Sequence, residues 1–414
     1  MEEKIIKDKL LENFLKYVSI SSQSNEENKD IPSSKGQLVL AKKLAKELEE
    51  LGANNIRINE YGVLQAVIEA KGVDEKKTPK IGWVCHLDTV DVGLSPDINP
   101  RIEKSYDGTD IVLDSSENIV LSPNEEKSLA NYLGDDLIVT DGKSVLGADN
   151  KAAIANVITA LWYIRENPSI KHGKIYLAFV PDEEIGLRGV RKIDFDNFDV
   201  DFAYTIDCCG LGELVYETFN AASGNLKIKG LSAHPMSSKN KLVNPIMIAH
   251  DFISMLDRSK MPEHTEGREG YIWITDIKSD VINCELKFNI RDHDKKKFLN
   301  KKAYLMKITD LLSERYNKAK IEIEIEDTYA NILDSVNEDN YLAIEKLKKA
   351  FEKLAIRPKI IPMRGGTDGS YLSTRNILTP NYFTGAHNFH SNKEFIPMDS
   401  FYKSFLVTLE LMSI

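Results

Sequence analysis

The sequence predicts an α/β protein, with a mixed sheet flanked by helices, into which an α+β domain of the split βαβ, or ferredoxin-like, type is inserted. Three apolar segments of strand length run directly into His, Asp or Glu residues, and in open α/β sheets the ligand crevice lies at the carboxyl ends of the strands. Between residues 215 and 328 the expected order of elements changes to βαββαβ. At 414 residues the chain is too long for one typical core. We therefore expect one domain built from residues 1–214 and 329–414, interrupted by a second domain at 215–328.

Composition and charge narrow the class of protein. Apolar residues make up 42% of the chain and charged residues 29%, which is an ordinary globular composition. The longest apolar runs fall well short of a membrane span. The net charge of −10 argues against nucleic acid as the main partner, because binding phosphates needs clustered Lys and Arg. Residues 1–20 carry acids from the second residue on, so they predict an amphipathic helix rather than a signal peptide. The four cysteines form no disulfide framework, which favours a reducing cytoplasm.

The first third of the chain predicts a helix followed by strands. A helix and three strands are expected, in order, at residues 36–51, 56–60, 63–70 and 81–90. The last of these is apolar enough to be buried, and its polar end carries His86 and Asp88. Residues 93–139, rich in Asp, Ser, Asn and Pro, predict a long excursion from the sheet.

A Gly/Asp-rich turn then delivers Asp149 to the start of a long helix over 149–166, in which apolar residues recur at helical spacing. Asp is among the best residues for capping a helix N-terminus, so capping is the simpler interpretation of Asp149 taken alone. Two further buried-type strands follow and end in acids: residues 174–180 lead into Asp182, Glu183 and Glu184, and residues 201–206 lead into Asp207.

The remaining elements complete the inserted domain and return to the first. The inserted domain is expected to contain elements at 224–230, 244–257, 270–277, 281–291, 294–317 and 319–327. A helix at 339–354 and a strand-like run at 359–363 restore α/β character. The loops RGGTDGS and TGAHNFHS follow, before a closing helix from Ser400.

The residues at the strand ends indicate metal chemistry. His86 and Asp88 are two apart on a strand and share a face, and a carboxylate usually orients a metal-binding imidazole. Of the adjacent Glu183 and Glu184, one can reach a metal while the other faces bound water. Each signal is weak alone, since most such groups are simply solvated. The full set supplies two His and at least three carboxylates, which suit two zinc-type ions sharing a bridging carboxylate: His86, Asp149, Glu184, Asp207 and His390.

Taken together, these segments resemble a known family. The segments HLDT, GADNK, DEEIG, IDCC and NFHS resemble the ordered motif set of the M20 co-catalytic zinc peptidases. VLSPNEE, SAHPMSSKNKLVNP and MRGGTDGSYLS are similar to the tripeptide aminopeptidase branch of that family, and the match covers nearly the whole chain. The resemblance implies an enzyme with two zinc ions per subunit that removes the N-terminal residue from tripeptides.

Carried over residue by residue, the resemblance implies that Asp149 bridges the two ions. Glu184 and His390 would complete the ligands of one ion, and His86 and Asp207 those of the other. A cis peptide bond after Asp149 is a further implication.

The resemblance also implies roles around the ions. Asp88 would orient His86, and Glu183 would be the general base that takes a proton from the attacking water and passes it to the leaving amine. His234 matches a lid histidine that reaches the scissile carbonyl, although a surface-loop His before Pro is the alternative interpretation. In many family members this His comes from a partner subunit, so a homodimer is left open.

Substrate contacts are less defined. Arg291 and Arg364 could grip the substrate carboxylate, because Arg offers a planar bidentate fork, or could be structural. Lys239, Asn240 and Asn244 are weaker candidates. The chain departs from the family in two places, with Met236 after His-Pro and with Cys208 and Cys209 after the third strand's Asp. We expect neither cysteine to be a ligand.

Two alternatives stay open. A relative acting on dipeptides, acylated amino acids or C-terminal residues would share every metal ligand and differ only in the pocket. A catalytically silent peptide-binding protein would keep the fold without needing Glu183. The expected partners are small peptides, without nucleic acid or membrane.

Overall fold

The computed structural model describes residues 2–414, which divide into two compact units. Unit 1 comprises the chain up to Tyr216 together with Val336–Ile361 and Thr367–Ile414, and unit 2 comprises Glu217–Ser335 and Pro362–Gly366. The short Pro362–Gly366 segment, which we expected in the first domain with the rest of residues 329–414, belongs to unit 2. Within the described residues, no helix is both long enough and apolar enough to cross a membrane.

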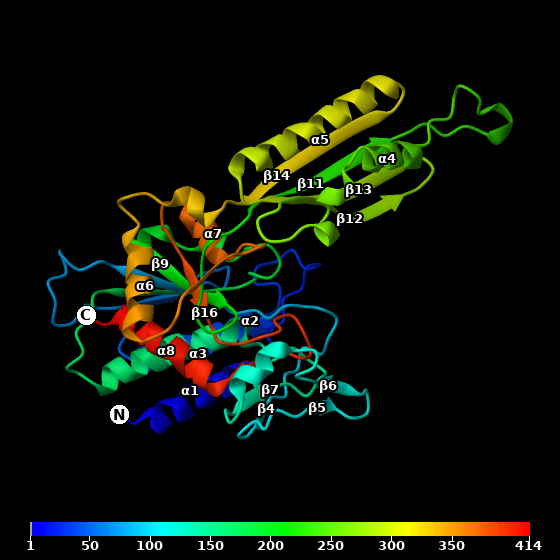
Figure 1. Cartoon of the computed structure of the whole chain (residues 1–414). Coiled ribbons are helices and arrows are strands. Elements are labelled where there is room, and N and C mark those ends of the chain that lie inside the picture. The colour runs from blue at the N-terminus through cyan, green and yellow to red at the C-terminus, as the bar shows by residue number, and fades with distance from the viewer. Residues whose placement is uncertain (1) are drawn as a thin grey trace. The chain divides into compact units, whose positions relative to one another are not determined.

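Unit 1 contains an eight-stranded mixed sheet (Figure 1). The strand order is β1 (Asn54–Ile58), β2 (Leu64–Ile68), β8 (Ile175–Val180), β3 (Ile81–His86), β9 (Phe202–Cys208), β16 (Asn381–Phe383), β10 (Glu213–Glu217) and β15 (Lys359–Pro362). The strands β8, β3, β9 and β16 are parallel, whereas β2 and β10 pair antiparallel to their neighbours. Because β8, β3 and β9 are parallel and adjacent, their carboxyl ends lie at one edge of the sheet. The predicted α/β class with a mixed sheet is confirmed.

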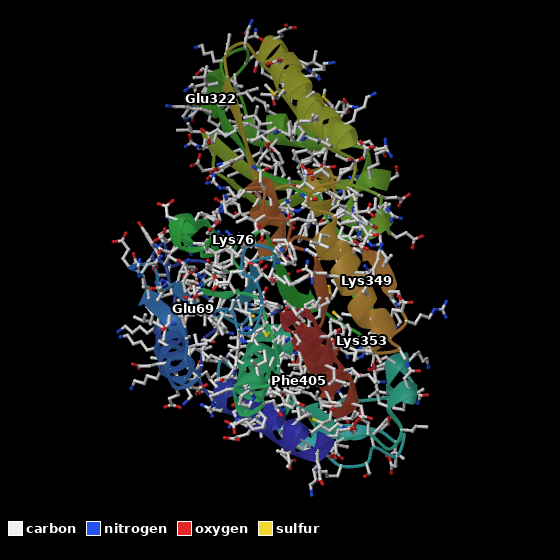
Figure 2. The ribbon with its side chains drawn as sticks, turned by 90° about the vertical axis from the view of Figure 1, so that its left-hand side faces the viewer. Glu69, Lys76, Glu322, Lys349, Lys353 and Phe405 are labelled. Carbon is white, nitrogen blue, oxygen red and sulfur yellow. The ribbon has the colours of Figure 1, made fainter. Side chains whose placement is uncertain are left out.

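The helices of unit 1 pack around this sheet. They are α1 (Glu3–Val18), α2 (Lys35–Glu50), α3 (Ala148–Glu166), α6 (Leu342–Lys353), α7 (Asp368–Thr374) and α8 (Met398–Met412). Helix α3 contacts α1, α8, β3 and β9 and is buried almost throughout, which fits its apolar sequence. Figure 2 shows Lys349 and Lys353 pointing outward from α6, whereas Phe405 of α8 is fully buried.

The excursion at 93–139 forms small sheets of its own. Strands β4 (Arg101–Glu103) and β7 (Leu137–Val139) join β17 (Phe395–Pro397) in a three-stranded sheet, and β5 (Ile111–Asp114) pairs with β6 (Ile119–Leu121). Leu113, Leu129 and Phe395 are among the apolar residues that give this region a core. The excursion is therefore fastened to the C-terminal part of the chain.

Unit 2 has the element order β11 (Asn220–Lys229), α4 (Pro245–Ser254), β12 (Tyr271–Ser279), β13 (Asn283–Asp292), α5 (Lys295–Arg315) and β14 (Lys320–Tyr329). This is the expected βαββαβ order, and its four strands form an antiparallel sheet in the order β12-β13-β11-β14. Buried Leu226 and Ile228 alternate with exposed lysines, so one face of the sheet packs against the two helices.

Candidate metal centre

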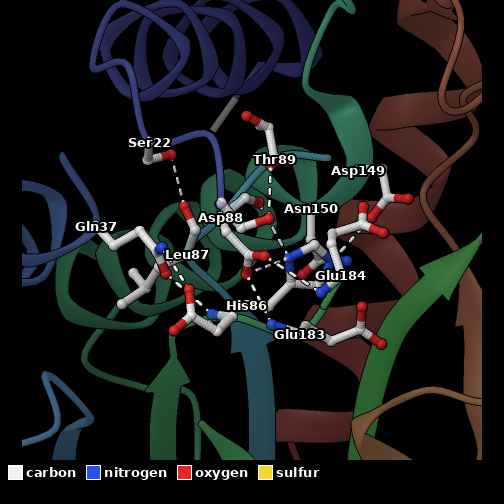
Figure 3. A network of polar contacts seen from close by, with 12 residues as sticks. Ser22, Gln37, His86, Leu87, Asp88, Thr89, Asp149, Asn150, Glu183 and Glu184 are labelled. Carbon is white, nitrogen blue, oxygen red and sulfur yellow. Dashed lines mark hydrogen bonds and ion pairs between the residues drawn. The ribbon is translucent and has the colours of Figure 1, made fainter. Parts of the chain in front are cut away.

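Three of the other predicted ligands, His86, His390 and Glu184, lie around the carboxylate of Asp149. Figure 3 shows His86 and Glu184 beside Asp149. The ring nitrogen Nε2 of His86 lies 2.9 Å from Asp149 Oδ1. Nε2 of His390 lies 3.2 Å from the other carboxylate oxygen of Asp149, Oδ2. The same nitrogen lies 3.0 Å from Glu184 Oε1. One donor atom each from His86, Asp149 and Glu184 falls within 4.8 Å of the others. Asp149 thus holds an imidazole on each of its oxygens.

The local backbone explains how Asp149 reaches this position. Regular helical geometry is interrupted at Asp149 and Asn150, whose φ/ψ angles are −83°/101° and −120°/20°, and the peptide bond between them is cis, as the resemblance implied. Gly147, at φ 73°, precedes the helix instead of an Asp cap. The carboxylate of Asp149 therefore faces the histidines and does not cap α3.

The charges of these groups are strongly coupled. Burial disfavours the charged form of His390, yet hydrogen bonds to Asp149 and Glu184 raise its pKa to about 11. Burial opposes the charge of His86 as well, and its bonds to Asp149 and Asp88 raise its pKa well above the usual value. Imidazole nitrogens and carboxylate oxygens at this spacing are the donor set that zinc prefers, and binding it would require both rings to release their protons. The residues present fit the predicted metal.

Asp88 supports the centre from behind His86. The ring nitrogen Nδ1 of His86 lies 3.1 Å from the main-chain oxygen of Asp88 and 3.3 Å from its Oδ1. The two carboxylate oxygens of Asp88 also accept from the backbone N–H groups of Glu183 (3.0 Å) and Glu184 (3.2 Å). One buried carboxylate therefore fixes the ring of His86, leaving Nε2 toward Asp149, and holds the turn that carries both glutamates.

Glu183 and Asp207 are the other predicted acids at this edge. Burial raises the pKa of Glu183 well above its usual value; nearby His86 opposes the shift, and Asp207 adds to it. A raised pKa makes the carboxylate of Glu183 a stronger proton acceptor. Asp207 accepts at Oδ1 from Nδ2 of Asn150 at 3.2 Å, and burial followed by the charge of Asp149 raises its pKa.

Comparison with known proteins decides the family. Residues 144–413 match the model of peptidase family M20/M25/M40. The chain belongs to peptidase family M20. It is 48% identical to a peptidase T-like protein from Yersinia pestis over 97% of both chains, and 43% identical to peptidase T from Clostridium botulinum over 95% of this chain and 96% of that protein. The crystal structure of aminopeptidase PepT from Bacillus cereus has the same fold, with a TM-score of 0.75 at 21% identity over 98% of both chains. The family predicted from the motifs is confirmed.

The predicted substrate and lid residues of this M20 chain lie in unit 2, whereas the predicted metal ligands lie in unit 1. The roles of these residues of unit 2 stay predictions. Arg291 Nη1 donates to the main-chain oxygens of Ala222 (3.2 Å) and Ile290 (3.1 Å). Arg364 donates to Gly267 O, Glu269 O and Thr265 Oγ1, and its guanidinium lies over the rings of Phe219 and Tyr271.

The 231–243 loop of unit 2 carries the other two residues. His234 is exposed, and its Nδ1 accepts from the backbone N–H of Met236 at 3.2 Å. Asn240 adopts a left-handed φ of 62°, and its main-chain oxygen accepts from Lys318 at 2.8 Å.

Sequence reasoning gave no role to two buried carboxyl groups of unit 1, Asp182 and Asp368. Asp182, at φ 56°, accepts through its carboxylate from the backbone and hydroxyl of Ser33 and from Gln37 Nε2, which fixes the start of the turn before Glu183. Asp368 is buried, and burial raises its pKa to about 7, against the opposing charge of His86. Asp182 could have been found from the sequence, because it directly precedes Glu183 and Glu184 at the end of the same strand. A lone Asp in the Gly-rich RGGTDGS segment is typical of a turn, so Asp368 carried no such signal.

The cysteines stand apart from the donor set. Cys85 and Cys208 are buried and Cys209 is half-buried, and burial raises the pKa of all three thiols. Among the described residues, the group of donors within 4.8 Å contains no cysteine.

Proposed function

We propose that this chain is a zinc-dependent aminopeptidase that removes the N-terminal residue from tripeptides. The observation that carries the proposal is the carboxylate of Asp149 with one imidazole on each oxygen, beside a buried glutamate, in an M20 chain. The relatives named peptidase T support the tripeptide branch, since they match almost the whole chain.

The two oxygens of Asp149 support the proposal of two ions per subunit. A bridging carboxylate presents one oxygen to each ion, and each oxygen here faces a different histidine. His86 with Asp207 would hold one ion, and His390 with Glu184 the other. Two members of this set, Asp207 and His390, are not part of the group of donor atoms that all lie within 4.8 Å of one another. Nε2 of His390 still lies within 3.2 Å of both Asp149 and Glu184, and Asp207 lies beside Asn150.

The residues of the chain divide the chemistry among them. Bound zinc would supply Lewis-acid chemistry, polarising the peptide carbonyl and lowering the pKa of water. Glu183 takes a proton from the water as the water oxygen attacks the carbonyl carbon. When the C–N bond breaks, Glu183 returns the proton to the leaving amine. Asp88 keeps both His86 and Glu183 in place during these steps.

A product assay tests the proposal. The zinc-loaded protein is expected to release free Leu and Gly-Gly from Leu-Gly-Gly, with little activity on Gly-Gly or an N-acetyl amino acid. Release of Leu-Gly and free Gly would instead indicate a carboxypeptidase, and hydrolysis of the acylated substrate would indicate an N-acyl hydrolase. No turnover of any of the three substrates by the fully loaded protein would favour a silent binding protein.

Partners and location remain predictions. The expected partners are small peptides, and the number of subunits can be measured by light scattering. A homodimer would matter for catalysis only if one subunit supplies His234 to another. Mixing His234→Ala with Glu183→Ala protomers checks this, because recovered activity requires shared sites. Fractionation of the source cells checks the cytoplasmic location.

A further inference from the structure

Two segments that carry predicted metal ligands adjoin the same pair of strands. Strand β17 pairs with β7, with Phe395 opposite Val139. From β7 the chain runs through the Gly/Asp-rich turn to Asp149. Just before β17, the chain forms the loop that carries His390. The side chains of Asp149 and His390 then meet at 3.2 Å.

Glu394 connects these two segments. It is the last residue before β17, and only 1% of its surface is exposed. Its Oε2 accepts from the backbone N–H groups of Leu146 (2.7 Å) and Gly147 (2.9 Å), and its Oε1 accepts from the backbone N–H of Asp149 at 3.3 Å. Three main-chain donors from the Asp149 turn thus converge on one carboxylate from the His390 loop.

The other side of the His390 loop is anchored independently. His387 and Phe395 exchange two backbone hydrogen bonds, of 2.8 and 3.2 Å, and their rings stack at 4.9 Å. The hydroxyl of Tyr132 lies 2.6 Å from His387 Nε2. Farther along, Asn392 Nδ2 donates to the main-chain oxygen of Gly142 at 3.0 Å. These contacts hold the loop in place, and Glu394 at its end binds the neighbouring turn.

We propose that Glu394 is a positioning residue that sets the placement of the Asp149 carboxylate relative to His390. The carboxyl group of Glu394 can accept from all three backbone donors at once, because both of its oxygens have acceptor sites. A glutamine offers one acceptor oxygen, and its NH₂ group would face a backbone N–H. The turn would have to move away from one end of the amide, and Asp149 would move with it. This inference rests on the proposed metal centre.

The test compares Glu394→Gln with Glu125→Gln. Glu125 is exposed and pairs with Lys393 of the same loop at 2.7 Å, so its substitution makes the same carboxyl-to-amide change without touching the Asp149 turn. Each protein is stripped of metal, its melting temperature is measured, and zinc affinity is determined by competition with a chromophoric chelator. The visible spectrum of the Co²⁺-loaded protein reports the ligand geometry.

We expect Glu394→Gln to bind zinc about 10- to 100-fold more weakly than the wild type, with a changed Co²⁺ spectrum. Glu125→Gln should match the wild type in both. Wild-type zinc affinity and an unchanged Co²⁺ spectrum in Glu394→Gln would overturn the inference, whatever its melting temperature.

If Glu394→Gln does not fold, Glu394→Asp replaces it, because it keeps the carboxyl group and only shortens the reach by one methylene. The folded Asp variant is expected to lose zinc affinity, and unchanged affinity would overturn the proposal. A wild-type chain that binds no zinc would instead refute the proposed function itself, and the inference with it.

Discussion

The predicted metal ligands of unit 1 and the 231–243 loop of unit 2 are built in opposite ways. His86 and Asp88 are 2% and 0% exposed, and Asp88 and Glu394 both accept from main-chain N–H groups beside the ligands. In the loop, by contrast, His234 is exposed, and the side chain of Met236 is 92% exposed. Buried carboxylates therefore hold the segments that carry His86, Asp149 and Glu184, although the side chain of His390 is itself 43% exposed. His234, in contrast, accepts a hydrogen bond from the backbone of its own short turn.

This contrast matches the different roles predicted for the two places. A metal site needs its donors placed before binding, because moving them afterwards costs affinity. A catalytic donor on an exposed loop can complete a site later, once substrate is held. Substitutions at the two places should therefore separate metal binding from turnover.

The adjacent glutamates provide the sharpest separation. Glu183→Gln should lower kcat by about 10²–10⁴, the usual contribution of a general acid–base group, while zinc content stays near the wild-type value. Glu184→Gln should lose zinc, because its Oε1 lies 3.0 Å from the His390 nitrogen among the donors. Metal analysis alongside a Leu-Gly-Gly assay measures both. Equal zinc loss in the two variants would show that the division of roles is wrong.

His234 should affect turnover alone. If it donates a hydrogen bond to the oxyanion, His234→Ala should lower kcat by about 10²–10³ and leave zinc content and melting temperature unchanged. The exposed His250 of the same unit offers a matched control, since His250→Ala removes an imidazole elsewhere. Near-normal turnover in His234→Ala would leave the residue as an ordinary surface histidine.

Asp88 should affect metal binding more moderately. Asp88→Asn keeps the size of the side chain but leaves one backbone N–H, of Glu183 or Glu184, facing an NH₂ group. We expect a loss of zinc affinity of about 10- to 100-fold, with a smaller second effect on kcat through Glu183. Chelator competition and steady-state kinetics measure the two separately. A variant with wild-type zinc affinity would show that Asp88 does not orient His86.

The arginines of unit 2 should give the smallest effects. An enzyme that grips the carboxylate of a tripeptide measures a span of about 10–11 Å, so losing that grip should raise KM and relax the preference for three residues. Arg291→Ala and Arg364→Ala are compared with the exposed Arg258→Ala on tri-, tetra- and pentapeptides. Arg364→Ala should also lower the melting temperature, because Arg364 donates to Glu269 O and Thr265 Oγ1, both at 2.7 Å. Unchanged length selectivity in both variants would leave the two arginines as structural residues.

The strand-end residues could be predicted because sheet geometry makes them neighbours. His86, Glu184 and Asp207 each follow an apolar run, and the adjacent parallel strands β8, β3 and β9 bring those ends to one edge. Asp149 was ambiguous from sequence alone, since a helix-capping Asp and a metal-bridging Asp leave the same local pattern. The placement of the other His, Asp and Glu residues along the chain, together with the family resemblance, favoured the second interpretation.

The supporting residues could not be predicted, because their partners are distant in the chain and are main-chain atoms. Glu394 acts on Leu146 and Gly147 only because β17 pairs with β7, a contact that no local pattern announces. Asp182 likewise depends on Ser33 and Gln37, which approach it from the start of the chain. Backbone N–H groups carry no side-chain signature, so a carboxylate that binds them looks like any other acid in the sequence.

The position of the metals tests the central claim most directly. A crystal structure of the zinc-loaded chain, with zinc located by anomalous scattering, is expected to show two ions about 3.5–4 Å apart with one oxygen of Asp149 on each. His86 should contact one ion, and His390 and Glu184 the other. A fully loaded chain with a single ion, or with the Asp149 carboxylate turned away from both ions, would contradict the account.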